Sequence, residues 1–205
     1  MHPYLIFWIT FVVLVLVILF LSRKYQMLRD TSTGFPKPYS YSRVQLAWWT
    51  VVVLSSLITI IFVKGALPTL DSSTLILLGI SAGTTVIARL TDISDRANAE
   101  PSSLLSQDFN GENFLLDILS DKNGVSIHRF QAVLINIIFG IWFISMVLQH
   151  LGGLPPCVND ANTADCAAHP LNYIMPVIGM NNLILLGISA GTYAAVKSTE
   201  NKAIV

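Results

Sequence analysis

Five long stretches of the chain contain no charged side chain, and polar segments separate them. These stretches are 4–21, 44–63, 72–88, 130–149 and 171–196. A helix needs about 20 apolar residues to cross the hydrocarbon core of a bilayer. Because lipid cannot hydrogen-bond exposed backbone amides, runs of this length fold as helices. The pattern therefore predicts an all-α membrane protein with five transmembrane helices.

One ten-residue sequence, LILLGISAGT, occurs twice, at 75–84 and at 183–192. The copies lie 108 positions apart, and an earlier pair, SRVQ at 42–45 and HRFQ at 128–131, lies 86 positions apart. A duplication of this kind indicates an architecture built from similar units. Each unit holds two apolar spans and begins on the same side of the membrane. We therefore expect two parallel two-helix repeats, not inverted ones.

The predicted domain plan has four parts. They are an N-terminal anchor helix at 1–23, a first two-helix repeat at 39–92, a cytoplasmic loop at 93–125 and a second two-helix repeat at 126–198. Gly34, Pro36 and Pro38 exclude a continuous helix between the anchor and the first repeat. In the cytoplasmic loop, 112–120 (ENFLLDILS) has the spacing of a short amphipathic helix, and 121–124 (DKNG) predicts a turn.

Charged side chains make up 12% of the chain and hydrophobic ones 53%, whereas a soluble domain has about 25% charged residues. If the N-terminus lies outside, eleven of the 12 Lys and Arg residues fall in cytoplasmic segments, and only Lys64 lies outside. This bias is typical of cytoplasmic loops. We therefore expect the C-terminus to be cytoplasmic and no basic patch to remain for nucleic acid. Because no Lys or Arg precedes the first span and Arg23 and Lys24 follow it, a retained anchor is favoured over a signal peptide.

Both cysteines, Cys157 and Cys166, fall in the outer loop predicted at 150–172. Because oxidising compartments favour pairing, we expect a disulfide that closes a small surface loop. Two free thiols are the alternative. Only His150 and His169 lie nearby, which falls short of four well-spaced metal ligands. We therefore expect no metal and no cofactor.

Small residues recur at helical spacing in both LILLGISAGT copies. The expected helix-packing positions are Gly79, Ala82, Gly83, Gly187, Ala190 and Gly191. Glycines four residues apart share a helix face and let two helices approach closely in lipid. The alternative is that hydroxyl groups line a polar path for an ion or a small solute. Those hydroxyls belong to Ser81, Thr84, Ser189 and Thr192.

Few polar side chains lie deep in the predicted spans. Asn136 is the main one, and Thr50 is its counterpart by the 86-residue offset. We expect both to form interhelical hydrogen bonds, with contact to a ligand as the alternative. Four residues also recur at the cytoplasmic interface, namely Arg43, Gln45, Arg129 and Gln131. We expect the two arginines to anchor there by reaching toward the headgroups, and docking of a headgroup or a cytoplasmic partner is the alternative.

The sequence offers little for catalysis. The four histidines are scattered over both predicted sides of the membrane, and no GxSxG, HExxH or P-loop pattern occurs. No ionisable residue falls in the five predicted cores, which argues against a proton-coupled carrier. We therefore expect a protein that is not an enzyme.

Four segments resemble a group of bacterial inner-membrane proteins of uncharacterised activity. They are SRVQLAWW at 42–49, LLGISAGT at 77–84, LLDILSDKNGVSIHRFQ at 115–131 and LLGISAGTY at 185–193. The resemblance covers the four helices after the first, whereas the first helix and the cysteine loop look like additions. It implies a location in a bacterial inner membrane and implies no activity.

These patterns lead to one expected function and two alternatives. We expect a structural or adaptor subunit that forms a homo-oligomer in the bilayer through its small-residue helix faces. The segment 91–127 is then the surface for a cytoplasmic partner. A passive oligomeric channel lined by the Ser and Thr hydroxyls is the first alternative. An accessory subunit of a larger membrane complex is the second.

Overall fold

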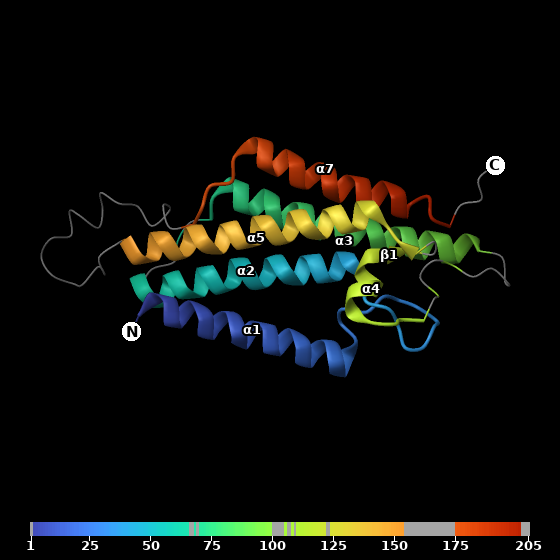
Figure 1. Cartoon of the computed structure of the whole chain (residues 1–205), viewed down its shortest axis with the longest axis horizontal. Coiled ribbons are helices and arrows are strands. Elements are labelled where there is room, and N and C mark those ends of the chain that lie inside the picture. Colours follow the sequence, from blue (N-terminus) through green and yellow to red (C-terminus); the bar gives the residue numbers. More distant parts are fainter. Residues whose placement is uncertain are drawn as a thin grey trace, which may run out of the picture.

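The chain folds into long helices that run along one axis of an elongated molecule (Figure 1). A computed structural model describes residues 2–65, 68, 70–99, 105, 108, 110–121, 124–153 and 175–201. Four of its helices are long and apolar enough to cross a membrane. They are α1 (Pro3–Tyr25), α2 (Tyr41–Lys64), α3 (Ser72–Asn98) and α5 (Ile127–Gly153). These helices indicate a multi-pass membrane protein.

The helix α7 (Met180–Lys197) occupies most of the fifth predicted span. It has 18 residues and begins with a polar turn that contains Asn181 and Asn182. It is not one of the four helices that meet the length and hydropathy of a membrane span. The structure thus contains the helix, and the count of five spans remains a prediction.

Local chemistry sets where the helices begin and end. Pro3 occupies the start of α1, where its missing N–H costs nothing. Gly65 ends α2 with a φ of 69°, a left-handed conformation that glycine adopts readily, and its N–H donates to the carbonyl of Ile61. Asp71 caps α3, because its carboxylate accepts a hydrogen bond of 2.7 Å from the Ser73 N–H.

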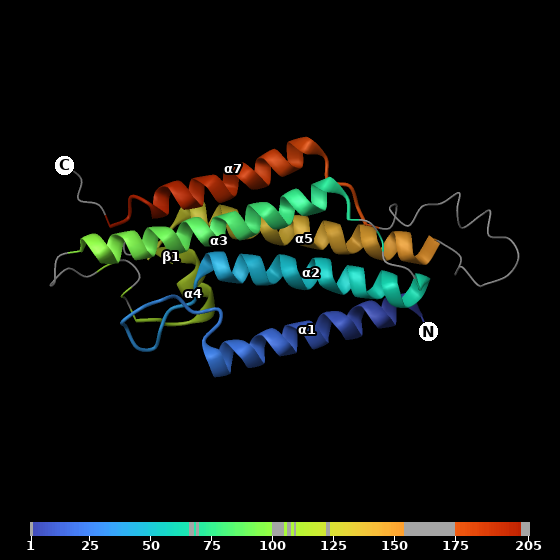
Figure 2. The same ribbon diagram turned by 180° about the vertical axis from the view of Figure 1, so that it is seen from behind.

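The long helices pack side by side in a fixed order. The neighbours of α2 are α1, α3 and α5, and α7 lies against α3 and α5. Figure 1 and Figure 2 show α1 and α7 on opposite sides of the bundle, with α2, α3 and α5 between them. The only buried residues of α1 are Phe7 and Ser22, so most of its large apolar side chains face outward. Outward apolar surface of this extent is typical of a helix in contact with lipid.

The main core lies between α2, α5 and α7 in the middle of the bundle. Trp49 and Phe143 are fully buried there, with ring centroids 6.4 Å apart in an edge-on arrangement. Val52, Val147 and Leu186 belong to the same buried cluster. Close packing of large side chains fixes how the helices are rotated about their axes.

One end of the bundle carries most of the described polar structure, and we call it the polar end. It consists of residues 26–40, 105, 108, 110–121, 124–126 and 198–201 together with the helix ends beside them. The short helix α4 (Phe114–Leu119) stands where the sequence predicts one, and the Asn113 side chain caps it. The strands β1 (Ser120–Asp121) and β2 (Gly124–Val125) then pair antiparallel on either side of 122–123, which lie outside the described residues.

Candidate functional site

Buried ion pairs join separate segments at the polar end. The Lys197 ammonium lies 2.9 Å from Asp92 Oδ1 on α3 and 3.8 Å from Asp30 Oδ2 in the connection after α1. All three side chains are almost entirely buried. Because a charge removed from water must be compensated, this cluster requires that α3, α7 and the connection be in place together.

Arg129, near the start of α5, forms a second buried pair. Its Nη2 lies 2.7 Å from Glu200 Oε1, its Nη1 donates to the Ser120 carbonyl, and its guanidinium lies 5.6 Å from the centre of the Tyr193 ring. Both charged side chains are at least nine-tenths buried. Arg129 therefore does not reach toward the headgroups as the sequence predicted. Arg129 turns inward because the C-terminal segment supplies a carboxylate, which no pattern near position 129 reveals.

The other predicted interface residues lie in different surroundings. Gln45 is buried, and its Nε2 donates to Asn136 Oδ1 at 3.3 Å. Arg43 is partly exposed, and its Nη1 donates to the Met27 carbonyl at 3.4 Å. Gln131 is exposed on α5. The four residues that recur in sequence therefore do not form one common surface.

Three potential metal ligands come together beside Arg129. One carboxylate oxygen of Asp121, one ring nitrogen of His128 and one carboxylate oxygen of Glu200 lie within 4.8 Å of one another. Glu200 is 92% buried, and its Oε2 has no hydrogen-bond partner in the described structure. The Ser126 hydroxyl lies 2.8–2.9 Å from the His128 ring nitrogens. Imidazole nitrogen and carboxylate oxygen are ligand types that transition metals use in proteins.

Sequence reasoning missed this group of three ligands. Asp121 and His128 are close in the chain, but Glu200 follows α7, and no fixed spacing links it to the other two. Only the return of the chain along α7 brings it to the start of α5. The one local signal was the polar DKNG turn beside a histidine.

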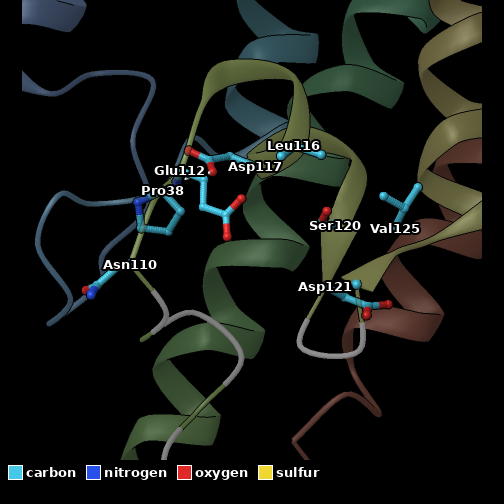
Figure 3. Close-up of a pocket in the computed structure, with 9 residues that line it drawn as sticks. Pro38, Asn110, Glu112, Leu116, Asp117, Ser120, Asp121 and Val125 are labelled. Atoms are coloured by element: carbon cyan, nitrogen blue, oxygen red, sulfur yellow. Dashed lines mark hydrogen bonds between the residues drawn. The ribbon is translucent and has the colours of Figure 1, made fainter.

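A pocket of about 370 Å³ opens next to these residues. Its lining comprises Pro38, Asn110, Glu112, Leu116, Asp117, Ser120, Asp121, Gly124 and Val125. Figure 3 shows Glu112 and Asp117 on one side of the pocket and Asp121 on the side formed by β1. Asp117 also has a structural role, since its two carboxylate oxygens accept hydrogen bonds from the Tyr39 and Glu112 amides. With three carboxylates in its wall, the pocket favours a cation.

Asp108 ties the connection after α1 to the end of α3. It accepts hydrogen bonds from the Thr33 hydroxyl and amide at 2.8 and 3.1 Å, and Arg96 lies 2.9 Å away. Partial burial raises the pKa of Asp108, but the bonds from Thr33 and the charge of Arg96 outweigh it, and the net pKa is lowered. The ionised carboxylate is thus the form that the folded structure favours.

Asn136 is the centre of a buried polar network between α2 and α5. Its Oδ1 accepts from Trp49 Nε1 at 2.7 Å, and its Nδ2 donates to the Tyr41 hydroxyl at 3.2 Å. The Trp48 indole donates to the Asn136 backbone carbonyl at 3.1 Å. Thr50 is placed differently, because its hydroxyl donates to the Leu46 carbonyl of its own helix. Of the two residues predicted to bond between helices, Asn136 joins α5 to α2, whereas Thr50 bonds within α2.

Gly140 gives α2 and α5 their close approach, a role that the repeat motif did not indicate. A Cβ at this position would lie 2.4 Å from Trp48 Cζ2. Because a Cβ at position 140 and the Trp48 ring cannot occupy the same space, the ring in this position fits only against a glycine.

Within the part of the chain that the structure describes, the glycines of the duplicated motif have almost no neighbour at the position of a Cβ. A Cβ built on Gly79, Gly83 or Gly191 would meet no atom within 4 Å, and one on Gly187 would meet only Ile80 Cδ1 at 3.9 Å. Ala82 is exposed and Ala190 is buried. Within the described residues, the glycine faces therefore do not bring α3 and α7 into close contact.

The two identical copies also bury different faces. In α3 the buried positions include Leu77, Ser81 and Thr84, whereas their counterparts in α7, Leu185, Ser189 and Thr192, are at least partly exposed. In α7 the buried residues are instead Leu183, Leu186, Ala190, Tyr193, Ala194 and Lys197. Leu77 of the first copy corresponds to Leu185 of the second, but in α7 the buried residue is Leu186, one position later. One residue turns a helix by roughly 100°, so the two copies bury faces that differ by about that angle.

The predicted pore-lining hydroxyls fall into two groups. On α3, Ser81 and Thr84 are buried and donate to the carbonyls of Leu77 and Ile80 in their own helix. On α7, Ser189 and Thr192 line a small pocket of about 60 Å³ between α5 and α7. The structure brings the hydroxyls of α3 and α7 to separate places.

Cys157 and Cys166 lie outside the described residues, so the outer loop and its disulfide remain predictions. The described chain instead concentrates its chemistry at the polar end, where buried ion pairs, three potential metal ligands and an acidic pocket adjoin. The chain matches no protein-family model, no curated protein and no solved structure.

Proposed function

We propose that this chain is a non-enzymatic integral membrane protein, a structural or adaptor subunit that assembles with further copies of itself. The observation that carries the proposal is the open space around Gly79, Gly83 and Gly191 on helices that otherwise expose large apolar side chains. Small residues at this spacing stabilise helix contacts in lipid when another helix packs on them. A second copy of the chain supplies such a helix.

In this proposal α7 is the fifth span, and α2–α3 and α5–α7 are two hairpins in parallel orientation. Two features support the arrangement: α2 contacts α3 as α5 contacts α7, and both hairpins begin at the polar end. The polar end then faces the cytoplasm, since it carries nearly all Lys and Arg residues of the chain. A bacterial inner membrane is the proposed location.

The orientation can be tested with single cysteines in a variant that lacks Cys157 and Cys166. Thr31→Cys and Ser198→Cys place thiols at the polar end, and His2→Cys places one at the opposite end; Thr31 and His2 are exposed. We expect an impermeant thiol reagent added to whole cells to label only His2→Cys. Labelling of Thr31→Cys in intact cells would contradict the orientation.

The adaptor role rests on the polar end. The segment 91–127, of which the structure describes a part, and the acidic pocket beside it form the surface offered to a partner. A rival role is that of an accessory subunit in a larger complex. Native purification followed by mass spectrometry distinguishes the two, because only an accessory subunit would co-purify in fixed proportion with a different membrane protein.

The assembly role is tested with Gly83→Leu and Gly191→Leu. Ser145→Leu is a matched control, because Ser145 is an exposed small residue in the span of α5. We expect both glycine variants to reduce the oligomer mass in detergent and the energy transfer between labelled copies in bilayers. The control should assemble as the unchanged protein does. Normal assembly of both glycine variants would refute the packing role.

The channel is less favoured because the Ser81 and Thr84 hydroxyls are already bonded within α3. If the purified protein conducts in planar bilayers and Thr84→Val or Thr192→Val alters the current, the channel replaces the structural role.

A further inference from the structure

We infer that Asp121, His128 and Glu200 form a binding site for a divalent transition-metal ion of the Zn²⁺ type. Their ligand atoms lie within 4.8 Å of one another although they belong to three segments: β1, the first turn of α5 and the chain after α7. The inference does not depend on oligomer formation. It goes beyond the proposed function, because it assigns a ligand to the polar end.

Glu200 provides the second, independent observation. Its Oε1 is held by the Arg129 guanidinium at 2.7 Å, while its Oε2 is buried and has no hydrogen-bond partner in the described structure. A buried carboxylate oxygen without a partner is costly. A cation coordinated by this oxygen removes that cost. Arg129 holds the carboxylate by its other oxygen and thereby positions it.

His128 fits the role of a nitrogen ligand. The Ser126 hydroxyl lies 2.9 Å from Nδ1 and 2.8 Å from Nε2, yet it forms a hydrogen bond with one ring nitrogen at a time. When a metal binds one nitrogen, the hydroxyl is left beside the other. There it accepts a hydrogen bond from the ring N–H and orients the ring, as partners of metal-bound histidines commonly do.

The ligand set points to zinc-like ions over Mg²⁺ and Ca²⁺. One imidazole and two carboxylates suit Zn²⁺ or Co²⁺, whereas Mg²⁺ and Ca²⁺ prefer oxygen ligands alone. Zinc bonds of about 2.0–2.2 Å place tetrahedral ligand atoms roughly 3.4 Å apart. Because the three ligand atoms lie within 4.8 Å of one another, they need to draw together by at most about 1.4 Å when the metal binds.

The acidic pocket gives the ion a route to the site. Asp121 belongs both to the pocket and to the three ligands, and Glu112 and Asp117 add two further carboxylates. Carboxylates concentrated in a concave surface raise the local concentration of cations. Once bound, the metal would connect the end of α7 to the β1–β2 hairpin and stabilise the docking of the C-terminal segment.

Calorimetric titration of Zn²⁺ into the full-length protein tests the site, with the protein stripped by chelator and held in detergent. We expect one Zn²⁺ per chain, and His128→Gln, Asp121→Asn and Glu200→Gln should each weaken binding by about tenfold or more, since even an outer partner of a ligand contributes about that much. His150→Gln is a matched control that should bind as the unchanged protein does. Mg²⁺ should bind more weakly than Zn²⁺.

A second measurement guards against loss of folding. Asp121→Asn leaves the Arg129–Glu200 pair intact, and circular dichroism checks that each variant remains helical. Zn²⁺ should raise the Tm of the unchanged protein more than that of Asp121→Asn at the same Zn²⁺ concentration. Co²⁺ should give the visible absorption of a tetrahedral centre, which His128→Gln abolishes. Equal Zn²⁺ affinity in the unchanged protein and all three ligand variants, or equal binding of Mg²⁺, would overturn the inference.

Discussion

The indole of Trp49 and the side-chain amide of Asn136 meet in the interior between α2 and α5. Trp49 Nε1 donates to Asn136 Oδ1 at 2.7 Å, and 87 positions of the chain separate the two residues. Trp49 is 1% exposed and Asn136 is 5% exposed, so water does not compete for this bond. The first helix of each predicted repeat thus contributes one partner, and the bond fixes their relative rotation.

Replacing Asn136 by Leu should destabilise the protein by about 2 kcal/mol, because the buried groups of Trp49, Tyr41 and Gln45 lose their partner. Thr50→Val is the matched control at the counterpart position and should cost less than about 0.6 kcal/mol, since its hydroxyl bonds within its own helix. The free energy of unfolding in mixed micelles measures both. Similar costs for the two variants would show that the network does not hold α2 to α5.

Gly140→Ala should destabilise the protein by about 1–3 kcal/mol, because a Cβ would lie 2.4 Å from the Trp48 ring. Gly83→Ala should leave the stability of the single chain unchanged or raise it by up to about 1 kcal/mol, since its Cβ meets no atom within 4 Å and alanine favours helix. Thermal unfolding of the two variants side by side checks the contrast. A stable Gly140→Ala variant would mean that α2 and α5 pack farther apart.

Arg129→Met should cost about 3 kcal/mol or more, because it leaves the buried Glu200 carboxylate without its partner. Arg43→Met, the same change at the counterpart in the first repeat, should cost less than about 1 kcal/mol, since Arg43 is partly exposed. Arg129→Met combined with Glu200→Met should recover part of the loss. If the double variant is no more stable than Arg129→Met alone, the pair is not the cause.

The contact of Asp108 with Thr33 and Arg96 should depend on pH. Because the pKa of Asp108 is lowered in the folded protein, its stabilising effect is present above the ordinary carboxylate value. The effect is then lost as the pH falls through the lowered pKa. Carboxyl NMR of Asp108 should give a midpoint below 3.8, the ordinary value. Arg96→Gln should raise that midpoint, and an unchanged midpoint would exclude Arg96 as a cause.

Much of the secondary structure followed from the sequence because its causes are local. Uncharged runs predict where α1, α2, α3 and α5 lie, and Gly34, Pro36 and Pro38 interrupt the helical chain between α1 and α2. The short helix at 114–119 is also present, and the segments that flank the predicted turn pair as antiparallel strands. The number of membrane spans was less accessible, since α7 begins with a polar turn that lowers its hydropathy.

The candidate site could be predicted only in part. The sequence identified Arg129 because an arginine recurs at the same place in both repeats. It predicted contact with the membrane interface, whereas the structure has a buried ion pair with Glu200. It also identified Asn136 as an interhelical residue. It could not foresee Gly140, because the need for a glycine there arises from the Trp48 ring on another helix.

The sequence by itself determined that this is a helical membrane protein with a duplicated motif, since apolar run length and identity between segments are properties of the chain alone. Only the tertiary structure decided which face each copy of the motif buries, because helix rotation depends on the neighbours against which α3 and α7 pack. It also decided that Asp121, His128 and Glu200 meet. The physical reason is that contacts between distant segments are fixed by packing of the whole bundle, which no local pattern of residues encodes.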